Sequence, residues 1–289
     1  MKKVAILGCE NSHANSFIKY VKSKPEFADI EIVGVYSDDM GASEKLASEF
    51  GVPVLSDYTD AVGKIDGLIV TARHGDNHYK YAQPYISSAV PMFIDKPITV
   101  SELDAIRLID ELKNASVKVT GGSSLRHDKF VQTLKAEHLR DTDGKTTGGF
   151  VRAPLISQNA YGGFFFYAQH LVEIVCEIFG RYPQNVKASV VGDKTTVIFN
   201  YGAFEVVGVY SENSNEYYAT RLTATSAHGS SLVCTADNDW FYNEFSDFVD
   251  ILRGGEQKMS YDDFIAPVFI MNAITRSIAS KRGEDIIYG

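Results

Sequence analysis

Short apolar runs alternate with amphipathic segments through residues 1–122, and this alternation constrains the fold more than any other feature of the chain. The apolar runs predict strands at Val4–Leu7, Ile30–Val35, Leu68–Thr71, Met92–Ile94 and Val117–Thr120. Apolar residues at three-to-four spacing predict helices between them, over Ala42–Phe50, Tyr79–Ser88 and Leu103–Leu112, with Ser101 as an N-cap. Alternation of this kind predicts an α/β domain built on a doubly wound parallel sheet.

The pattern changes after residue 122. Further strands are expected at Val186–Val190, Thr195–Asn200, Phe204–Tyr210 and Thr220–Ala224, and helices at Ala168–Phe179, Trp240–Leu252 and Tyr261–Ser280. Strands that follow one another without intervening helices favour an antiparallel sheet. We therefore expect two domains, residues 1–122 and residues 123–289, the second an α+β domain with a largely antiparallel sheet.

Charge and cysteine content exclude several classes of function. The formal net charge is −9, whereas nucleic-acid binding normally needs a basic surface. Cys9, Cys176 and Cys234 are widely separated, which indicates neither a disulfide framework nor a thiolate metal site and fits a reducing cytoplasm. The apolar run after Lys2 and Lys3 is too short for a signal peptide or a membrane span. We expect a cytoplasmic protein with neither a nucleic-acid nor a membrane partner.

The first strand ends in a glycine loop with the sequence VAILGCENSHANSF, which begins at Val4. In the G-x-G-x-x-G fingerprint of dinucleotide-binding Rossmann domains, the glycines form a tight turn, admit the pyrophosphate and allow helix and strand to pack closely. Gly8 holds the first position, but Glu10 and His13 hold the others. Glu10 brings a carboxylate near the phosphates, which costs affinity unless it turns to solvent. His13, Asn11 and Ser12 are expected to donate to a phosphate at the helix N-terminus.

The end of the second strand bears on cofactor choice. The acidic residue that usually holds the ribose hydroxyls is replaced by Ser37, and Asp38 and Asp39 follow it. We expect these carboxylates to repel a 2′-phosphate, so the sequence favours NAD over NADP.

Several motifs occur in the order typical of one enzyme family. They are the strand with Gly8, the segment SEKLASEFGVP at Ser43–Pro53, Thr71 with His78, Asp95-Lys96-Pro97 after a strand, Gly162-Gly163 with His170, and Phe245–Arg253 with Ser260–Asp263. Together they resemble the Gfo/Idh/MocA oxidoreductases. The resemblance implies an N-terminal domain that binds NAD or NADP, a C-terminal domain that forms the substrate wall and a homodimer or homotetramer interface, and hydride transfer on sugars, inositols or related polyols.

The resemblance also implies site residues. Lys96 and His170 match the groups that take the hydroxyl proton and stabilise the developing alkoxide. The family's aspartate four residues before the histidine corresponds to Phe166, which cannot orient an imidazole. Thr71, His78 and Asp95 are candidate cofactor contacts, and Arg126, Tyr161 and Tyr167 candidate substrate contacts. His170 and His78 serve equally well as capping or core groups, Arg126 as a surface charge, and the aromatic cluster Tyr161–Tyr167 as core.

Two alternatives remain open at this point. His13, His74, His78 and His127 all follow predicted strand ends, but His74-x-x-x-His78 lacks the glutamate of H-E-x-x-H, so we expect no metal site. The chain is then either an NAD-dependent oxidoreductase or a catalytically silent relative that binds a metabolite or a protein in the same cleft. Glu10, His13 and Phe166 favour the silent relative, and Asp95-Lys96-Pro97 favours the enzyme.

Overall fold

The computed structural model describes residues 1–141, 143–232 and 240–289, and divides into two compact units. The first unit comprises residues 1–122 and 241–264, and the second comprises residues 123–240 and 265–289. Cys234 lies outside the described residues. Among the described residues, no helix combines the length and hydropathy that a bilayer crossing requires.

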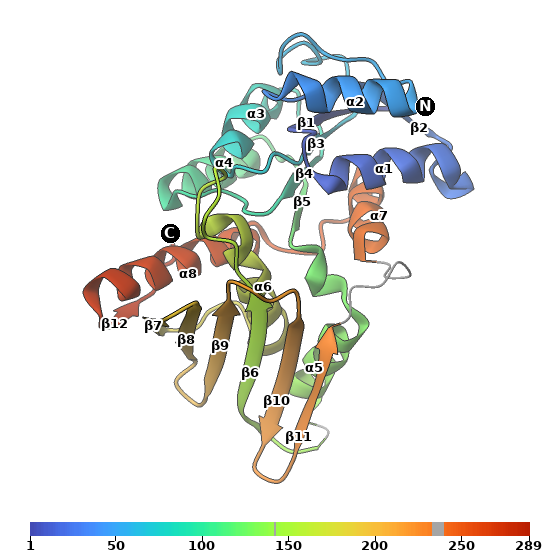
Figure 1. Ribbon diagram of the computed structural model, residues 1–289. Helices are drawn as coiled ribbons and strands as arrows, with labels where there is room; N and C mark the ends of the chain where they lie inside the picture. The colour runs from blue at the N-terminus through green and yellow to red at the C-terminus, as the bar shows by residue number, and fades with distance from the viewer. Residues whose placement is uncertain (142, 233–239) are drawn as a thin grey trace. The chain divides into compact units, whose positions relative to one another are not determined.

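A five-stranded parallel sheet forms the centre of the first unit (Figure 1). Its order is β2-β1-β3-β4-β5, and adjacent strands run parallel throughout. The strands are β1 (Lys2–Leu7), β2 (Ile30–Tyr36), β3 (Gly67–Val70), β4 (Met92–Asp95) and β5 (Val119–Gly122), and the helices are α1 (Ser12–Ser23), α2 (Met40–Phe50), α3 (Asp76–Ile86) and α4 (Glu102–Asn114). This arrangement confirms the predicted doubly wound parallel sheet.

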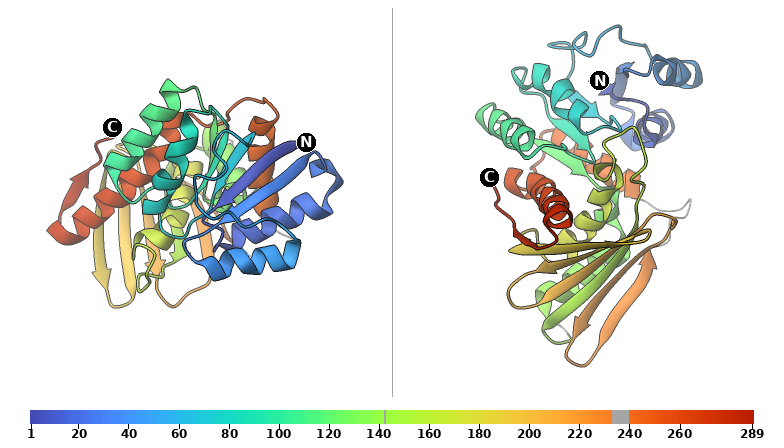
Figure 2. Two further views of the ribbon diagram at one scale, coloured as in Figure 1. Left: turned by 90° about the horizontal axis from the view of Figure 1, so that it is seen from above. Right: turned by 60° about the vertical axis from the view of Figure 1, so that its left-hand side comes forward.

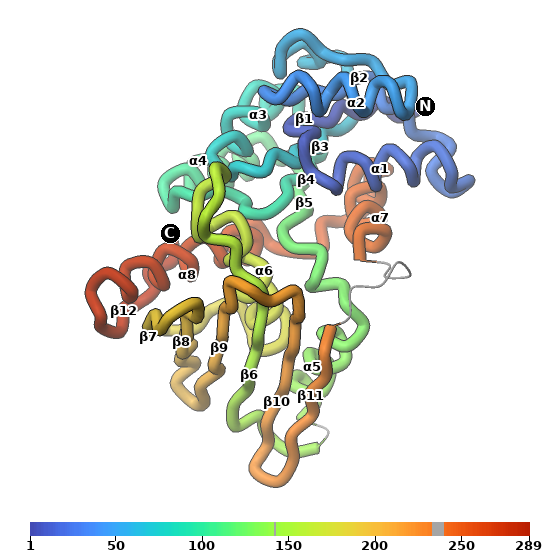
Figure 3. The backbone as a smooth tube through the Cα atoms, viewed as in Figure 1, coloured from blue at the N-terminus to red at the C-terminus, as the bar shows by residue number. Residues whose placement is uncertain are grey.

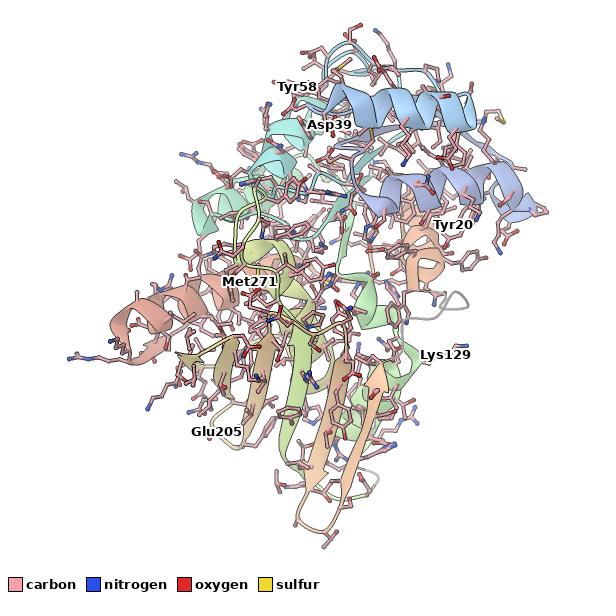
Figure 4. The ribbon with its side chains drawn as sticks, viewed as in Figure 1. Tyr20, Asp39, Tyr58, Lys129, Glu205 and Met271 are labelled. Atoms are coloured by element: carbon pink, nitrogen blue, oxygen red, sulfur yellow. The ribbon has the colours of Figure 1, made fainter. Side chains whose placement is uncertain are left out.

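Helix boundaries in this unit follow side-chain caps. The Ser101 hydroxyl accepts a hydrogen bond from the backbone N–H of Asp104 at 3.3 Å, as expected of the N-cap of α4. Asp39, labelled in Figure 4, caps α2 in the same way. Gly51 ends α2 in the left-handed region at φ +66°, where a side chain would be strained.

Helix α7 (Trp240–Leu252) lies in a different unit from the one that the sequence predicted. Residues 241–264 were expected in the second domain but belong to the first unit. Figure 3 shows α7 beside α1, and the rings of Phe17 and Phe245 stack at 4.9 Å. Phe248 lies edge-on to Phe93 in the same core. Because aromatic burial of this kind is strongly stabilising, the helix joins the first unit despite its late position in the sequence.

A seven-stranded sheet forms the second unit, in the order β11-β10-β6-β9-β8-β7-β12 (Figure 2). All its strand pairs are antiparallel except β6 with β9, which confirms the largely antiparallel sheet. The strands are β6 (Thr146–Pro154), β7 (Asn185–Val191), β8 (Lys194–Asn200), β9 (Glu205–Ser211), β10 (Tyr217–Thr223), β11 (Ala227–Leu232) and β12 (Gly283–Asp285), and the helices are η2 (Ser124–His127), α5 (Lys129–Arg140), α6 (Phe165–Phe179) and α8 (Tyr261–Ser280).

Helices α5 and α6 pack against each other and cover one face of this sheet. Helix α6 packs on β6 and β9, whereas α5 packs on β10 and β11. The side chains that alternate toward this face, such as Val151, Val197 and Phe199, are fully buried.

Candidate active site

Gly8 makes the tight turn after β1. Its φ is +73°, and a Cβ atom there would stand 2.4 Å from the backbone of Ala72. The Thr71 hydroxyl donates to the carbonyl oxygen of Gly8 at 3.1 Å, which joins the loops that follow β1 and β3. Only glycine satisfies both the dihedral angle and the close approach, so Gly8 performs the role of the first fingerprint glycine.

Helix α1 begins immediately after this turn. Asn11 is its N-cap residue, but the Asn11 side chain donates to Asp95 Oδ2 at 2.8 Å instead of capping the helix. The Ser12 hydroxyl donates to Asn11 Oδ1 at 3.2 Å. No acidic residue lies in the first helical turn, so its backbone N–H groups and the positive end of the helix dipole suit an anion.

The Glu10 carboxylate adopts neither of the orientations considered from the sequence. Its Oε2 accepts a hydrogen bond from the Ser37 hydroxyl at 2.7 Å, and its Oε1 accepts one from the backbone N–H of Arg73 at 2.9 Å. Ser37, which follows β2, is buried and also accepts from the N–H of Asp39 at 3.0 Å. The carboxylate therefore bridges the ends of β2 and β3.

Asp38 and Asp39 are engaged elsewhere. Asp38 is exposed, accepts from the Tyr36 hydroxyl at 2.8 Å and lies 3.4 Å from Lys80 Nζ. Asp39 Oδ1 accepts from the N–H of Ala42 as the N-cap of α2. The carboxylate bonded to the end of β2 through Ser37 is thus that of Glu10.

His13 lies between two buried carboxylates. Its Nδ1 is 3.1 Å from Asp95 Oδ2, its Nε2 is 3.2 Å from Glu244 Oε2, and its ring packs on Phe241. Only 4% of His13 is exposed. The expectation that His13 donates to a phosphate is therefore corrected, because the imidazole is buried and both ring nitrogens lie close to carboxylates within the protein.

His13, Asp95 and Glu244 form a buried triad in which the two contacts of His13 are close approaches without hydrogen-bond geometry. Burial raises the pKa of Asp95 to about 6, and burial also lowers the pKa of His13. The lowered pKa of His13 favours a neutral imidazole, and the raised pKa of Asp95 makes its carboxyl easier to protonate.

Lys96 follows Asp95 at the end of β4 and is 5% exposed. Burial lowers its pKa, the Asp95 carboxylate opposes that shift, and the Arg73 guanidinium adds to it. The backbone N–H of Lys96 donates to Asp95 Oδ1 at 2.7 Å. A buried amine with a depressed pKa beside a carboxyl is typical of a residue that exchanges a proton at a functional site.

His78 bonds to backbone and holds two loops together. Its Nε2 is 2.7 Å from the carbonyl oxygen of Ala72, and its Nδ1 is 3.2 Å from that of Ile98. Burial lowers its pKa to about 4, so the imidazole is neutral and donates its single N–H to one of these two carbonyls. His78 thereby supports the loops that carry Thr71 and Lys96.

The group of potential metal ligands in the structure differs from the four histidines that the sequence suggested. Ligand atoms of His13, Asp95 and Glu244 all lie within 4.8 Å of one another. Each ring nitrogen of His13 faces a different carboxylate, and the charge of Lys96 acts on both His13 and Asp95. The positive charge of Lys96 beside this group disfavours a divalent cation there.

The remaining candidates lie in the second unit. His170 Nδ1 is 2.7 Å from the Ser123 hydroxyl, and both residues are buried. Phe166 contacts Tyr161 and Tyr167 with ring centroids 5.1 Å apart in each pair, and Tyr167 lies edge-on to His170. Arg126 lies in η2 and is buried, unlike a solvated surface arginine.

Two residues were missed by the sequence interpretation. Ser123 contacts His170, where an aspartate was expected from the family and Phe166 stands in the sequence. The only signal for Ser123 in the sequence is its position just after a predicted strand. Glu244 appears in the sequence merely as a polar residue of an amphipathic helix, WFYNEFSDF, and its burial depends on the return of α7 to the first unit.

Comparison with protein-family models gives a match over residues 2–123 to the oxidoreductase family with an NAD-binding Rossmann fold, GFO_IDH_MocA. This match spans the parallel-sheet domain. A search of curated proteins finds no match.

Solved structures match the chain over both units. The myo-inositol dehydrogenase of Corynebacterium glutamicum superposes with a TM-score of 0.83 at 14% identity, covering all of both chains. The scyllo-inositol dehydrogenase of Lactobacillus casei, solved with NAD(H) and scyllo-inositol, gives 0.84 at 13% identity over 99% of both chains. GenD2 from gentamicin A biosynthesis, in complex with NAD, gives 0.84 at 17% identity over 99% of this chain and 96% of its own. At these identities, the likeness establishes the fold.

The N-terminal domain has features that fit a dinucleotide. Gly8 keeps the turn tight, the first turn of α1 is free of acidic residues, and the Glu10 carboxylate is bonded to Ser37 and Arg73. The backbone N–H groups after Gly8 would hold the pyrophosphate.

Proposed function

We propose that the protein is an NAD-dependent oxidoreductase that acts on a CH–OH group of a sugar, inositol or related polyol. The observation that carries this proposal is Lys96, a buried amine with a lowered pKa next to Asp95 at the end of β4 in a Rossmann domain. The ends of parallel strands are where such sheets bind their ligands.

Bound NAD⁺ would supply the hydride acceptor. The residues of the chain then orient the substrate hydroxyl and accept or return its proton. Because burial lowers its pKa, Lys96 is suited to take the hydroxyl proton as the carbonyl forms, and its charged form stabilises a developing alkoxide. In the reverse direction, the same amine returns the proton to the oxygen.

His170 acts in this proposal as a second acid, base or hydrogen-bonding group for the substrate. The Ser123 hydroxyl fixes the orientation of its ring, a task that an aspartate would otherwise perform. Tyr161 and Tyr167 offer partly exposed rings for contact with a sugar ring, and Arg126 offers a donor. We further propose a cytoplasmic homodimer or homotetramer that associates through the seven-stranded sheet.

A turnover assay tests the proposal. The purified protein is incubated with NAD⁺ or NADP⁺ and a panel of inositols, sugars and sugar alcohols, and reduced nicotinamide is followed by its absorbance. We expect reduction of NAD⁺ with at least one polyol. If nucleotide binds but no member of a broad panel is oxidised, the proposal fails, and the silent relative that Phe166 favours takes its place.

A further inference from the structure

We propose that Glu10, in the glycine loop, is the residue that reads the adenosine ribose and sets the preference for NAD over NADP. This inference rests on the proposed use of a dinucleotide but not on the identity of the substrate. In Rossmann sheets, the residue that accepts hydrogen bonds from the ribose hydroxyls is an acid at the end of the second strand. Here that place is held by Ser37, which has no carboxylate.

The structure supplies a carboxylate to this place from the neighbouring strand. Glu10 follows β1, the strand next to β2, and its Oε2 accepts the Ser37 hydroxyl hydrogen at 2.7 Å. Ser37 is fixed in turn by the N–H of Asp39 at 3.0 Å. This second bond occupies the acceptor side of the hydroxyl, so its hydrogen is directed at Glu10. The orientation of the carboxylate is therefore built into the end of β2.

The second oxygen of Glu10 accepts the backbone N–H of Arg73 at 2.9 Å, which holds the carboxylate from the β3 side. A carboxylate has about four lone-pair positions, and these two bonds use two of them. Glu10 is partly exposed, so the others are available to a pair of ribose hydroxyls. Such a carboxylate would repel a phosphate on the ribose 2′ position.

The other charged residues near the end of β2 interact with groups other than Glu10. Lys80 is engaged with Asp38 and lies over the rings of Tyr58 and Tyr81, at 5.3 Å and 5.2 Å from their centroids. The Arg73 guanidinium acts on Lys96. Asp38, the acid expected from the sequence to repel the 2′-phosphate, accepts from the Tyr36 hydroxyl and is salt-bridged to Lys80.

Matched variants distinguish the contributions of Glu10 and Asp38 to the cofactor preference. NADH and NADPH, which differ only in the 2′-phosphate, are titrated calorimetrically into the wild-type protein, Glu10→Gln and Asp38→Asn. We expect the wild type to bind NADH more tightly. Glu10→Gln should weaken NADH and tighten NADPH, so that the ratio of their dissociation constants falls about tenfold or more, as the loss of a charge-assisted hydrogen bond implies. Asp38→Asn should leave the ratio within about twofold.

Ser37→Ala provides a second test should Glu10→Gln fold poorly, because it removes the hydroxyl that places Oε2; it should also lower the ratio. The inference is overturned if Glu10→Gln keeps the wild-type ratio of dissociation constants, or if Asp38→Asn is the only variant that loses the preference for NADH. It is also overturned if the wild-type protein binds NADPH more tightly than NADH, which would place a cation at the 2′ position. Failure of the wild type to bind either nucleotide overturns both this inference and the proposed function. Glu10-dependent binding without turnover of any polyol overturns only the proposed function.

Discussion

His13 Nε2 lies 3.2 Å from Glu244 Oε2, so the first turn of α1 is joined to α7 inside the first unit. The other ring nitrogen faces Asp95, the neighbour of Lys96 in sequence. Through this triad, the candidate catalytic lysine is linked to a helix encoded far along the chain. The triad is polar and buried, so its stability depends on every member being present.

His13→Ala is therefore expected to destabilise the fold. The substitution leaves Asp95 and Glu244 buried without the imidazole between them, at a cost of about 1–3 kcal/mol. Scanning calorimetry should show a lower melting temperature for the first unit. Asn15→Ala is the control, since Asn15 lies on the same helix and its side-chain amide donates to Glu49 at the surface. A melting temperature equal to that of the control would show that the triad contributes nothing.

The sequence predicted the fold of both units because strand and helix signals are local. Val4–Leu7 is apolar and lies within β1, and Ser101 caps α4 as expected. The triad could not be predicted, because the burial of Glu244 depends on how α7 packs against Phe17. The orientation of Glu10 likewise depends on Ser37 and Arg73, which come from two other strand ends.

His78 should make stability fall on acidification. Its native pKa is about 4, against an ordinary value of 6.5, so between these pH values the unfolded chain binds a proton that the native imidazole does not. The native state should thus lose up to about 3 kcal/mol relative to neutral pH. His78→Gln, which does not titrate, should show a shallower loss of melting temperature between pH 7 and about pH 4. His74→Gln, in the loop just before α3, serves as the control, and equal slopes in all three proteins would contradict the prediction.

Ser123 is expected to act as a positioning residue for His170. Ser123→Ala removes the 2.7 Å contact with Nδ1 and should lower kcat about tenfold, with KM and NADH affinity little changed. Ser123→Thr, which keeps the hydroxyl, should recover most of the activity. If both variants lose stability in parallel with activity, the role of Ser123 is structural only.

Lys96→Met offers the most direct test of the proposed chemistry. Methionine keeps most of the buried aliphatic volume but has no amine, and Lys80→Met, at an exposed lysine of the same unit, is the matched control. The measurement is kcat with NAD⁺ and the best polyol, together with the dissociation constant of NADH. We predict a loss of kcat of about a hundredfold or more in Lys96→Met, with NADH affinity within about threefold of wild type. An undiminished kcat in Lys96→Met would contradict the account.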